Sequence, residues 1–357
     1  MVSTTSISGT NAGFQIGQNN GHVDAHFHCH TEQSEISANR ACLQDLQTTN
    51  PGHDKDRIQT DKGGLLRDAY SWILNHADFK QWRDQQQSQL LWINGDPGKG
   101  KTMLFCGIID ELTELAKSAP NTTVISYFFC QATNVRINHA TAVLRGLIFM
   151  MVDQQPSLLS YVRRQYDKSG KQVFENANVW EALLEILTGI LGDPLLQTTY
   201  LIIDALDECT TGLDRLLEFI AQKSSAYPHI KWIVSSRNWP TIEEALDETS
   251  QKAKLCLELN AVSVTKAVAV FIDFRVKQLA SKKQYTNEIR DAVSQHLLSN
   301  AQDTFLWVAL VCEQLSKVHK RNVRKKLQEF PSGLDKLISE CWAILASRMK
   351  LNSVKRS

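Results

Sequence analysis

Five short, continuous apolar runs are the strongest pattern in the chain. They do not alternate polar with apolar residues, so we expect strands that are buried on both faces of a parallel sheet. The runs occupy residues 90–94, 124–129, 200–204, 231–236 and 254–259. Helical patterns lie between them, at residues 102–116, 139–153, 178–191, 212–226 and 240–248. This alternation predicts a three-layer α/β domain with about five parallel strands.

The pattern changes on both sides of this domain. Before it, apolar residues near helical spacing predict a helical lead-in over residues 41–89. After residue 259 the strand pattern ends, and three amphipathic stretches predict an all-helical region; they occupy residues 264–280, 287–298 and 303–318. Residues 1–40 are polar and lack a helical period, which predicts a disordered arm.

Composition narrows the class of protein only slightly. The chain has 357 residues, of which 43% are hydrophobic and 22% charged, as in soluble globular proteins of two or three domains. The formal net charge of +1 gives no overall attraction to nucleic acid or to an anionic membrane. Eight scattered cysteines without a C-x-x-C pair favour a reduced protein. The N-terminus lacks the features of a signal peptide and apolar stretches such as 305–312 are too short to span a bilayer, so we expect a cytoplasmic protein.

The segment GDPGKGKT, residues 95–102, follows the first apolar run and precedes a helical pattern. It satisfies the pattern G-x-x-x-x-G-K-[ST], which is typical of a loop that binds nucleotide phosphates. Glycines let backbone N–H groups turn toward phosphate oxygens, and the helix N-terminus adds its positive dipole end. Lys101 would contact the β- and γ-phosphates, and the Thr102 hydroxyl would bind Mg²⁺. The predicted nucleotide-binding residues are Gly95, Asp96, Pro97, Gly98, Lys99, Gly100, Lys101, Thr102 and Met103.

Two further strand ends carry candidate chemistry. The run YLIIDALDE ends its strand at Asp204, and a carboxylate in that place is a suitable Mg²⁺ ligand. Asp207 and Glu208 follow and could orient or deprotonate an attacking water. The run WIVSSR ends with Arg237, which could stabilise transition-state charge or could be an ordinary surface cation. We expect these side chains to meet at the carboxyl edge of the sheet.

With these three motifs in order, the chain resembles the NACHT-type signal-transduction NTPases of the STAND class, in particular the fungal group related to incompatibility and innate-immunity receptors. The resemblance covers residues 41–345 and includes the flanking segments KGGLLRDAYSWIL, NAQDTFLWVALVCEQL and FPSGLDKLISECW. It implies a P-loop NTPase domain over residues 90–260 and an all-helical subdomain over 261–330. Residues 331–357 would form an incomplete winged-helix segment.

The resemblance also implies a molecular switch. Such proteins hold a nucleoside diphosphate when inactive and a triphosphate, ATP or GTP with Mg²⁺, in an active homo-oligomer. Slow hydrolysis would reset the switch. Family members usually continue into a complete winged helix and ligand-sensing repeats, whereas this sequence ends at Ser357, so we expect a short or truncated form.

Residues 11–30 carry a separate pattern. Apolar residues alternate with polar ones around an Asn/Gly segment, which favours a β-arch; they are Phe14, Ile16, Val23, Ala25 and Phe27. The stretch resembles the amyloid signalling motifs of fungal receptors in this family, which template the same fold in a partner effector, and a disordered tail is the alternative. Metal binding is a third hypothesis, although no second ligand cluster closes a site; its candidate ligands are His22, His26, His28, Cys29 and His30.

Three functions therefore stay open. The first is a nucleotide-operated switch with slow NTPase activity, and the second is a non-catalytic nucleotide-binding adaptor that displays the N-terminal arm. The third, a small-molecule P-loop kinase, is disfavoured because no arginine-rich lid or acceptor site is evident. The basic run 317–326 has no interleaved aromatic residues, so we expect a solvated helix end and no nucleic-acid partner.

Overall fold

The computed structural model describes residues 32–85, 89–118, 122–247 and 252–339. The chain divides into two units, Met1–Ala41 and Cys42–Ser357, and the whole sheet belongs to the second. The amyloid, disordered-tail and metal-binding hypotheses for residues 11–30 fall outside the described residues.

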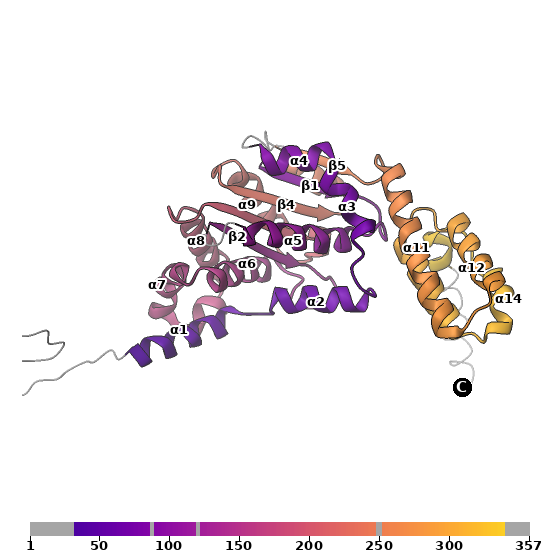
Figure 1. Ribbon diagram of the computed structural model, residues 1–357. Helices are drawn as coiled ribbons and strands as arrows, with labels where there is room; N and C mark the ends of the chain where they lie inside the picture. Colours follow the sequence, from indigo (N-terminus) through magenta and orange to yellow (C-terminus); the bar gives the residue numbers. More distant parts are fainter. Residues whose placement is uncertain (1–31, 86–88, 119–121, 248–251, 340–357) are drawn as a thin grey trace, which may run out of the picture. The chain divides into compact units, whose positions relative to one another are not determined.

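A five-stranded sheet forms the centre of the second unit (Figure 1). Its strand order is β2-β3-β4-β1-β5, and every neighbouring pair is parallel, so the predicted α/β fold is confirmed. The strands are β1 (Leu90–Asn94), β2 (Thr123–Phe129), β3 (Thr198–Asp204), β4 (Ile230–Ser236) and β5 (Lys252–Cys256). Because β3, β4 and β1 are neighbours, the loops that follow them lie side by side at one edge of the sheet.

Strand β5 differs from the prediction. The sequence predicts a strand buried on both faces at residues 254–259, whereas β5 begins two residues earlier, pairs only with β1 and buries only Leu255. The ammonium groups of Lys252 and Lys254 lie 5.3 and 4.9 Å from the ring centre of Trp92. Lysines suit an edge strand because they discourage pairing with a further strand.

Successive residues of the central strands pack on opposite faces of the sheet. In β1, Leu90 and Trp92 join one hydrophobic core, and Leu91 and Ile93 join the other. Helices on the first face are α6 (Ala140–Gln154), α7 (Leu159–Ser169), α8 (Val179–Leu191), α9 (Leu213–Ser224) and α10 (Pro240–Asp247). Helices on the second face include α2 (Pro51–Asp61), α3 (Arg67–Asn75), α4 (Ala77–Asp84) and α5 (Lys101–Lys117). The predicted three layers are therefore present, and α7 is an additional helix that the pattern did not indicate.

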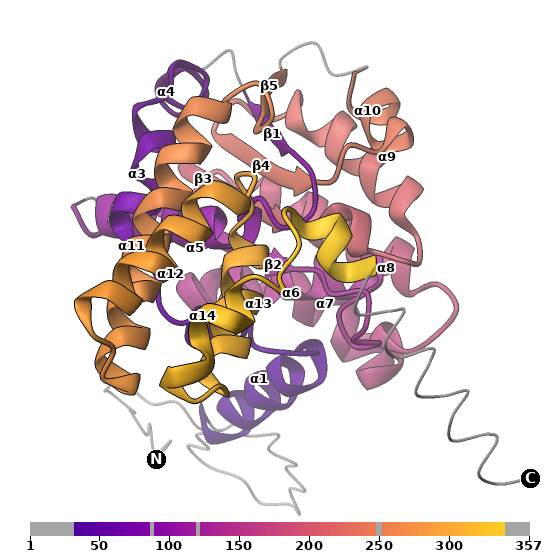
Figure 2. The same cartoon turned by 90° about the vertical axis from the view of Figure 1, so that its right-hand side faces the viewer.

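The helical region after β5 lies beyond the carboxyl ends of the strands (Figures 1 and 2). Its buried residues belong to the same core as α3 and α5, which ties it to the second face of the sheet. The three predicted helices are confirmed, and a short fourth follows them; they are α11 (Ala261–Lys283), α12 (Asn287–Asn300), α13 (Phe305–Ser316) and α14 (Val323–Leu327). None of the helices in the described part of the chain is long and apolar enough to cross a membrane.

Helix α1 (Glu32–Leu46) corrects the last part of the disordered arm predicted over residues 1–40, because residues 32–40 are helical, and the rest of the arm lies outside the described residues. Cys42 and Leu46 are fully buried and four residues apart, which is the spacing of one helix face. The residues before them include good helix formers such as alanine, glutamate and arginine, so the helix extends N-terminally past these two buried residues.

The contact between α3 and α5 leaves no space for a side chain at Gly107. We expect Gly107→Ala to lower the free energy of unfolding by about 1–2 kcal/mol, since overpacking outweighs the gain in helix propensity. The added Cβ would lie 2.5 Å from ring carbons of Tyr70. Urea denaturation measures the change. The control is Gly192→Ala, whose Cβ would lie 3.5 Å from the Thr188 carbonyl oxygen, an ordinary contact distance, so its stability should match wild type; equal stability of all three proteins would contradict this packing.

Candidate functional site

The loop between β1 and α5 has the backbone geometry that the phosphate-loop prediction requires. Gly98 and Gly100 have φ angles of +80° and +85°, a left-handed conformation that residues with a Cβ rarely adopt. The chain therefore turns tightly, and α5 begins at Lys101 directly after Gly100. This arrangement points the N-terminus of α5 toward the space above the loop, as phosphate binding needs.

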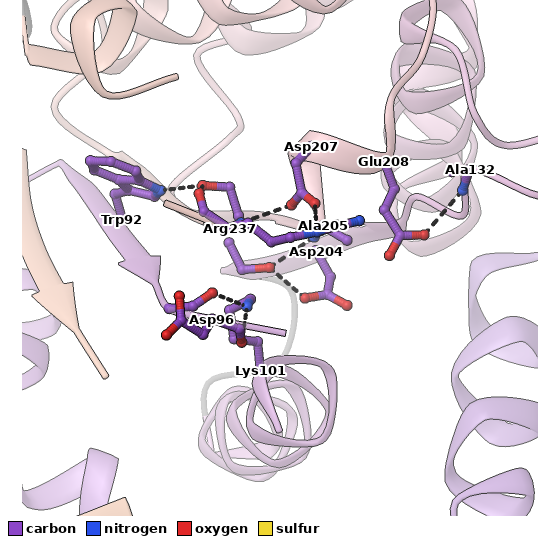
Figure 3. Close-up of polar contacts among 12 residues, drawn as sticks. Trp92, Asp96, Lys101, Ala132, Asp204, Ala205, Asp207, Glu208 and Arg237 are labelled. Atoms are coloured by element: carbon purple, nitrogen blue, oxygen red, sulfur yellow. Dashed lines mark hydrogen bonds and ion pairs between the residues drawn. The ribbon is translucent and has the colours of Figure 1, made fainter. Parts of the chain in front are cut away.

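Lys101 folds back over its own loop (Figure 3). Its ammonium group donates hydrogen bonds to the carbonyl oxygens of Gly95 and Asp96, the second at 3.1 Å. Burial lowers the pKa of Lys101, and nearby carboxylates, first that of Asp204, oppose this effect. The Lys101 ammonium at the start of α5 is therefore stabilised both by backbone carbonyls and by acidic side chains.

Asp204 lies at the end of β3 and is only 2% exposed. The Ser235 hydroxyl donates to its carboxylate at 2.5 Å, and the Thr102 hydroxyl is a second hydrogen-bond partner. Burial raises the pKa of Asp204, while these hydrogen bonds and the charge of Lys101 oppose the rise. The Thr102 hydroxyl and the Asp204 carboxylate thus form a close pair of oxygen donors, the type of donor that Mg²⁺ prefers. The residues present fit the metal predicted from the sequence.

The Asp207 carboxylate forms an ion pair with Arg237 and does not face open solvent (Figure 3). One carboxylate oxygen accepts the Arg237 backbone N–H at 2.9 Å, and the other accepts its Nε–H at 2.6 Å. The guanidinium also lies 5.8 Å from the ring centre of Trp239. Because both oxygens are engaged, this geometry favours a role for Asp207 in orienting Arg237 over direct activation of water.

Glu208 is half-buried and turned toward Ala132, in the loop that follows β2 (Figure 3). Its Oε2 accepts the Ala132 backbone N–H at 3.0 Å. Ala205 adopts a left-handed φ of +58°, which turns the backbone sharply after β3. Asp207 and Glu208 therefore point at different partners, and Glu208 is the more accessible of the two carboxylates.

A cavity of about 380 Å³ connects these groups. At its polar end it is lined by residues 97–104 and by Asp204, Asp207, Glu208 and Arg237. The predicted residues Gly95 and Asp96 do not line it; their carbonyls hold Lys101 instead. The other end is apolar, and its lining includes Leu65, Leu66, Trp72, Val264 and Phe271, whereas the lining residues Phe305 and Leu306 lie against Gly100 and Gly98 of the loop. A polar end beside an apolar one suits a nucleotide, whose charged phosphates and flat base require different surroundings.

The apolar end was not predicted from the sequence. Its residues come from α3 and the segment before it and from α11, which are far apart in the chain. Apolar residues in an amphipathic helix are usually core residues, so periodicity cannot single them out. The only local signal is the pair Gly63 and Gly64, whose φ angles of +88° and +96° turn the chain directly before Leu65.

Helix α3 is fixed to α5 by polar contacts to Glu111. The guanidinium of Arg67 donates to the Glu111 carboxylate at 2.9 Å, and the Tyr70 hydroxyl donates to it at 3.2 Å. These contacts fix the first turn of α3, which directly follows the cavity-lining residue Leu66.

Comparison with known proteins gives two sequence matches to families. Residues 68–237 match the family model described as Nephrocystin 3, N-terminal, and residues 264–330 match a domain of unknown function. The chain is 57% identical over 307 residues to the vegetative incompatibility protein HET-E-1 of Podospora anserina. That alignment covers 85% of this chain and 22% of HET-E-1, so the chain spans about a fifth of the length of this curated relative.

Two solved structures with distant similarity illustrate the comparison. The ORC2 protein of Aeropyrum pernix gives a TM-score of 0.45 at 13% identity, covering 74% of this chain and 68% of that one. Domain III of the Thermotoga maritima replication initiation protein DnaA gives 0.36 at 13% identity, covering 73% of this chain and 92% of that one.

The partners of the two neighbouring carboxylates predict different effects on stability. We expect Asp207→Ala to lower the free energy of unfolding by about 1–2 kcal/mol, because it removes a buried acceptor of two hydrogen bonds. Glu208→Ala removes the acceptor of one hydrogen bond at a half-exposed position and should cost under about 1 kcal/mol. Urea denaturation of both variants measures the difference. A larger loss for Glu208→Ala would contradict the assigned positioning role of Asp207.

Proposed function

The chain is a fungal NACHT-like protein, and from this premise we propose that it binds a nucleoside triphosphate with Mg²⁺ and acts as a signalling switch. The observation that carries the proposal is the convergence of Lys101, Asp204 and Arg237 on one cavity from the ends of three neighbouring strands. The apolar end of that cavity offers space for a base. ATP and GTP are both candidates, because the argument from the phosphate end applies equally to either.

The proposed roles follow from the positions of the side chains. Backbone N–H groups around Gly98 and Gly100 would bind phosphate oxygens, and Lys101 would leave its loop carbonyls to contact the β- and γ-phosphates. Thr102 and Asp204 would hold Mg²⁺, which when bound neutralises charge on the phosphate oxygens. The Asp207 carboxylate would keep Arg237 oriented toward the terminal phosphate.

Glu208 is the proposed general base for slow hydrolysis. Its carboxylate has one hydrogen bond to Ala132 and is half-exposed, so a small rotation could bring it to a water beside the terminal phosphate. Hydrolysis would return the switch to its diphosphate form. We further propose that the triphosphate form assembles into a homo-oligomer and signals in fungal self/non-self recognition, with the N-terminal segment recruiting an effector protein.

A non-catalytic nucleotide-binding adaptor is the second candidate. The observation that favours it is the position of the two carboxylates: Asp207 is engaged with Arg237, and Glu208 is turned toward Ala132. A protein in which both groups keep these partners after nucleotide binding would have no base beside the terminal phosphate. Measurement of hydrolysis therefore separates the two candidates.

Replacing Lys101 tests the binding site. We expect Lys101→Ala to weaken binding of the nucleotide about 100-fold, because it removes the ammonium that would contact the β- and γ-phosphates. Titration calorimetry with Mg-ATP and Mg-GTP measures the affinity. The matched control is Lys99→Ala in the same loop, whose ammonium donates to the Gln302 carbonyl at 3.3 Å, and which should change affinity less than about tenfold. Unchanged affinity of Lys101→Ala for both nucleotides would refute the site.

Replacing the two acidic candidates separates binding from hydrolysis. Glu208→Gln keeps the shape of the side chain but loses the basic carboxylate, so we expect normal affinity and hydrolysis slowed about 100-fold. Asp204→Ala removes a metal ligand, so it should weaken binding in Mg²⁺ more than binding in EDTA. Single-turnover hydrolysis and calorimetry provide the two readouts. Equal loss of binding in both variants would show that the roles are wrongly divided.

A further inference from the structure

Asp96, the second residue of the phosphate loop, is held from both sides. Its backbone N–H donates to Glu258 Oε1 at 2.6 Å, and its carbonyl oxygen accepts from the Lys101 ammonium at 3.1 Å. One residue therefore connects a carboxylate two residues beyond β5 with the cation that the phosphates need. Glu258 is absent from the phosphate-loop motif and from the acidic motif after β3.

Glu258 has several further hydrogen-bond partners. Its Oε2 lies 3.2 Å from Cys256 Sγ and 3.5 Å from Asn238 Nδ2. Burial would raise the pKa of Glu258, but the hydrogen bonds, led by that from the Asp96 backbone, outweigh it and the pKa is lowered. The side chain is therefore a carboxylate at neutral pH, and it adds a negative charge beside a loop suited to anions.

The hydrogen-bond network around Glu258 extends to the residues that follow β4. Asn238 follows Arg237 directly; its Nδ2 lies 3.3 Å from an Asp96 carboxylate oxygen, and its Oδ1 accepts from Asn94 Nδ2 at 2.7 Å. Asn94, the last residue of β1, is 3% exposed and its Oδ1 has no hydrogen-bond partner among the described residues. A buried amide with one unused acceptor suggests that this network can exchange partners.

Glu258 also stands three residues before the first residue of α11. Between them, Asn260 donates to the Cys256 carbonyl at 2.9 Å and lies 2.9 Å from His76 Nε2, between α3 and α4. The segment 256–260 therefore joins the phosphate loop to the helices that line the apolar end of the cavity.

We propose that Glu258 is a positioning residue that holds the phosphate loop in the conformation in which Lys101 rests on the Gly95 and Asp96 carbonyls, and that its negative charge opposes nucleotide binding. The inference rests on the proposed nucleotide function. When phosphates bind the Lys101 ammonium, the Asp96 carbonyl loses its hydrogen bond to that cation, and the contact between the Asp96 N–H and Glu258 weakens. Movement of residues 256–260 then transmits nucleotide binding at the phosphate loop to α11.

This role has two separable components, the hydrogen bond and the charge. Glu258→Gln keeps an acceptor for the Asp96 N–H and removes the charge, so triphosphate should bind about fivefold more tightly, with a smaller gain for diphosphate. Glu258→Ala removes both, and the loop loses its brace, so its affinity should fall at least about fivefold below that of Glu258→Gln. Glu244→Gln removes the same charge from an exposed side chain of α10 that takes no part in this network, so it should bind like wild type.

The experiment measures all four proteins by calorimetry with the Mg²⁺ complexes of ATP, ADP, GTP and GDP, after thermal melts show that each is folded. Hydrogen exchange of the peptide that contains the Asp96 amide provides a readout independent of nucleotide. Protection should persist in Glu258→Gln and be lost in Glu258→Ala.

The outcomes separate this inference from the proposed function. If wild type binds nucleotide, and Lys101→Ala does not, but Glu258→Gln binds no more tightly than wild type, the inference about Glu258 is wrong and the function stands. Equal affinities for Glu258→Gln and Glu258→Ala would also overturn it. If wild type binds none of the four nucleotides, the proposed function fails, whatever exchange shows for Asp96.

Discussion

The positive charge of Lys101 is the constraint on which the rest of the site depends. The fold places this ammonium at the start of α5 in a partly buried position, where losing water is costly unless hydrogen bonds and negative charges replace it. Carbonyl oxygens of its own loop supply the hydrogen bonds, and Asp204, Asp207 and Glu258 supply the surrounding charge. These partners come from the loops after β1, β3 and β5. The interactions of one cation therefore link three loops at the carboxyl edge of the sheet.

The helical region also reaches this loop. Leu306 N–H donates to the Gly98 carbonyl at 3.4 Å, and a Cβ at Gly98 would lie 2.7 Å from Thr304 Cγ2. Just before them, Gln302 and Asp303 adopt left-handed φ angles of +47° and +57°, which are costly for residues with a Cβ. A loop that changes shape when phosphates bind would therefore act directly on the start of α13, which is the coupling that a nucleotide-operated switch requires.

The parts of this structure that were predictable are those encoded in contiguous residues. The loop 95–102, the strand ending at Asp204 and the helices after residue 260 each carry a local pattern, and the structure contains all three. The apolar end of the cavity and the contact of Glu258 with Asp96 join segments far apart in the chain. A single sequence, considered alone, cannot show which distant residues are in contact. Strand β5 was misplaced because apolar Leu257 and Leu259 extend its pattern past its true end, and α1 was missed because its N-terminal half is polar.

The central claim is that Lys101 exchanges its loop carbonyls for nucleotide phosphates. A crystal structure of the chain with Mg²⁺ and a slowly hydrolysed triphosphate analogue tests it most directly. The account predicts the triphosphate on the loop 95–102, with Lys101 Nζ within hydrogen-bond distance of a β- or γ-phosphate oxygen and no longer bonded to the Gly95 and Asp96 carbonyls. A nucleotide bound elsewhere, or one bound at the loop while Lys101 stays on both carbonyls, would contradict it.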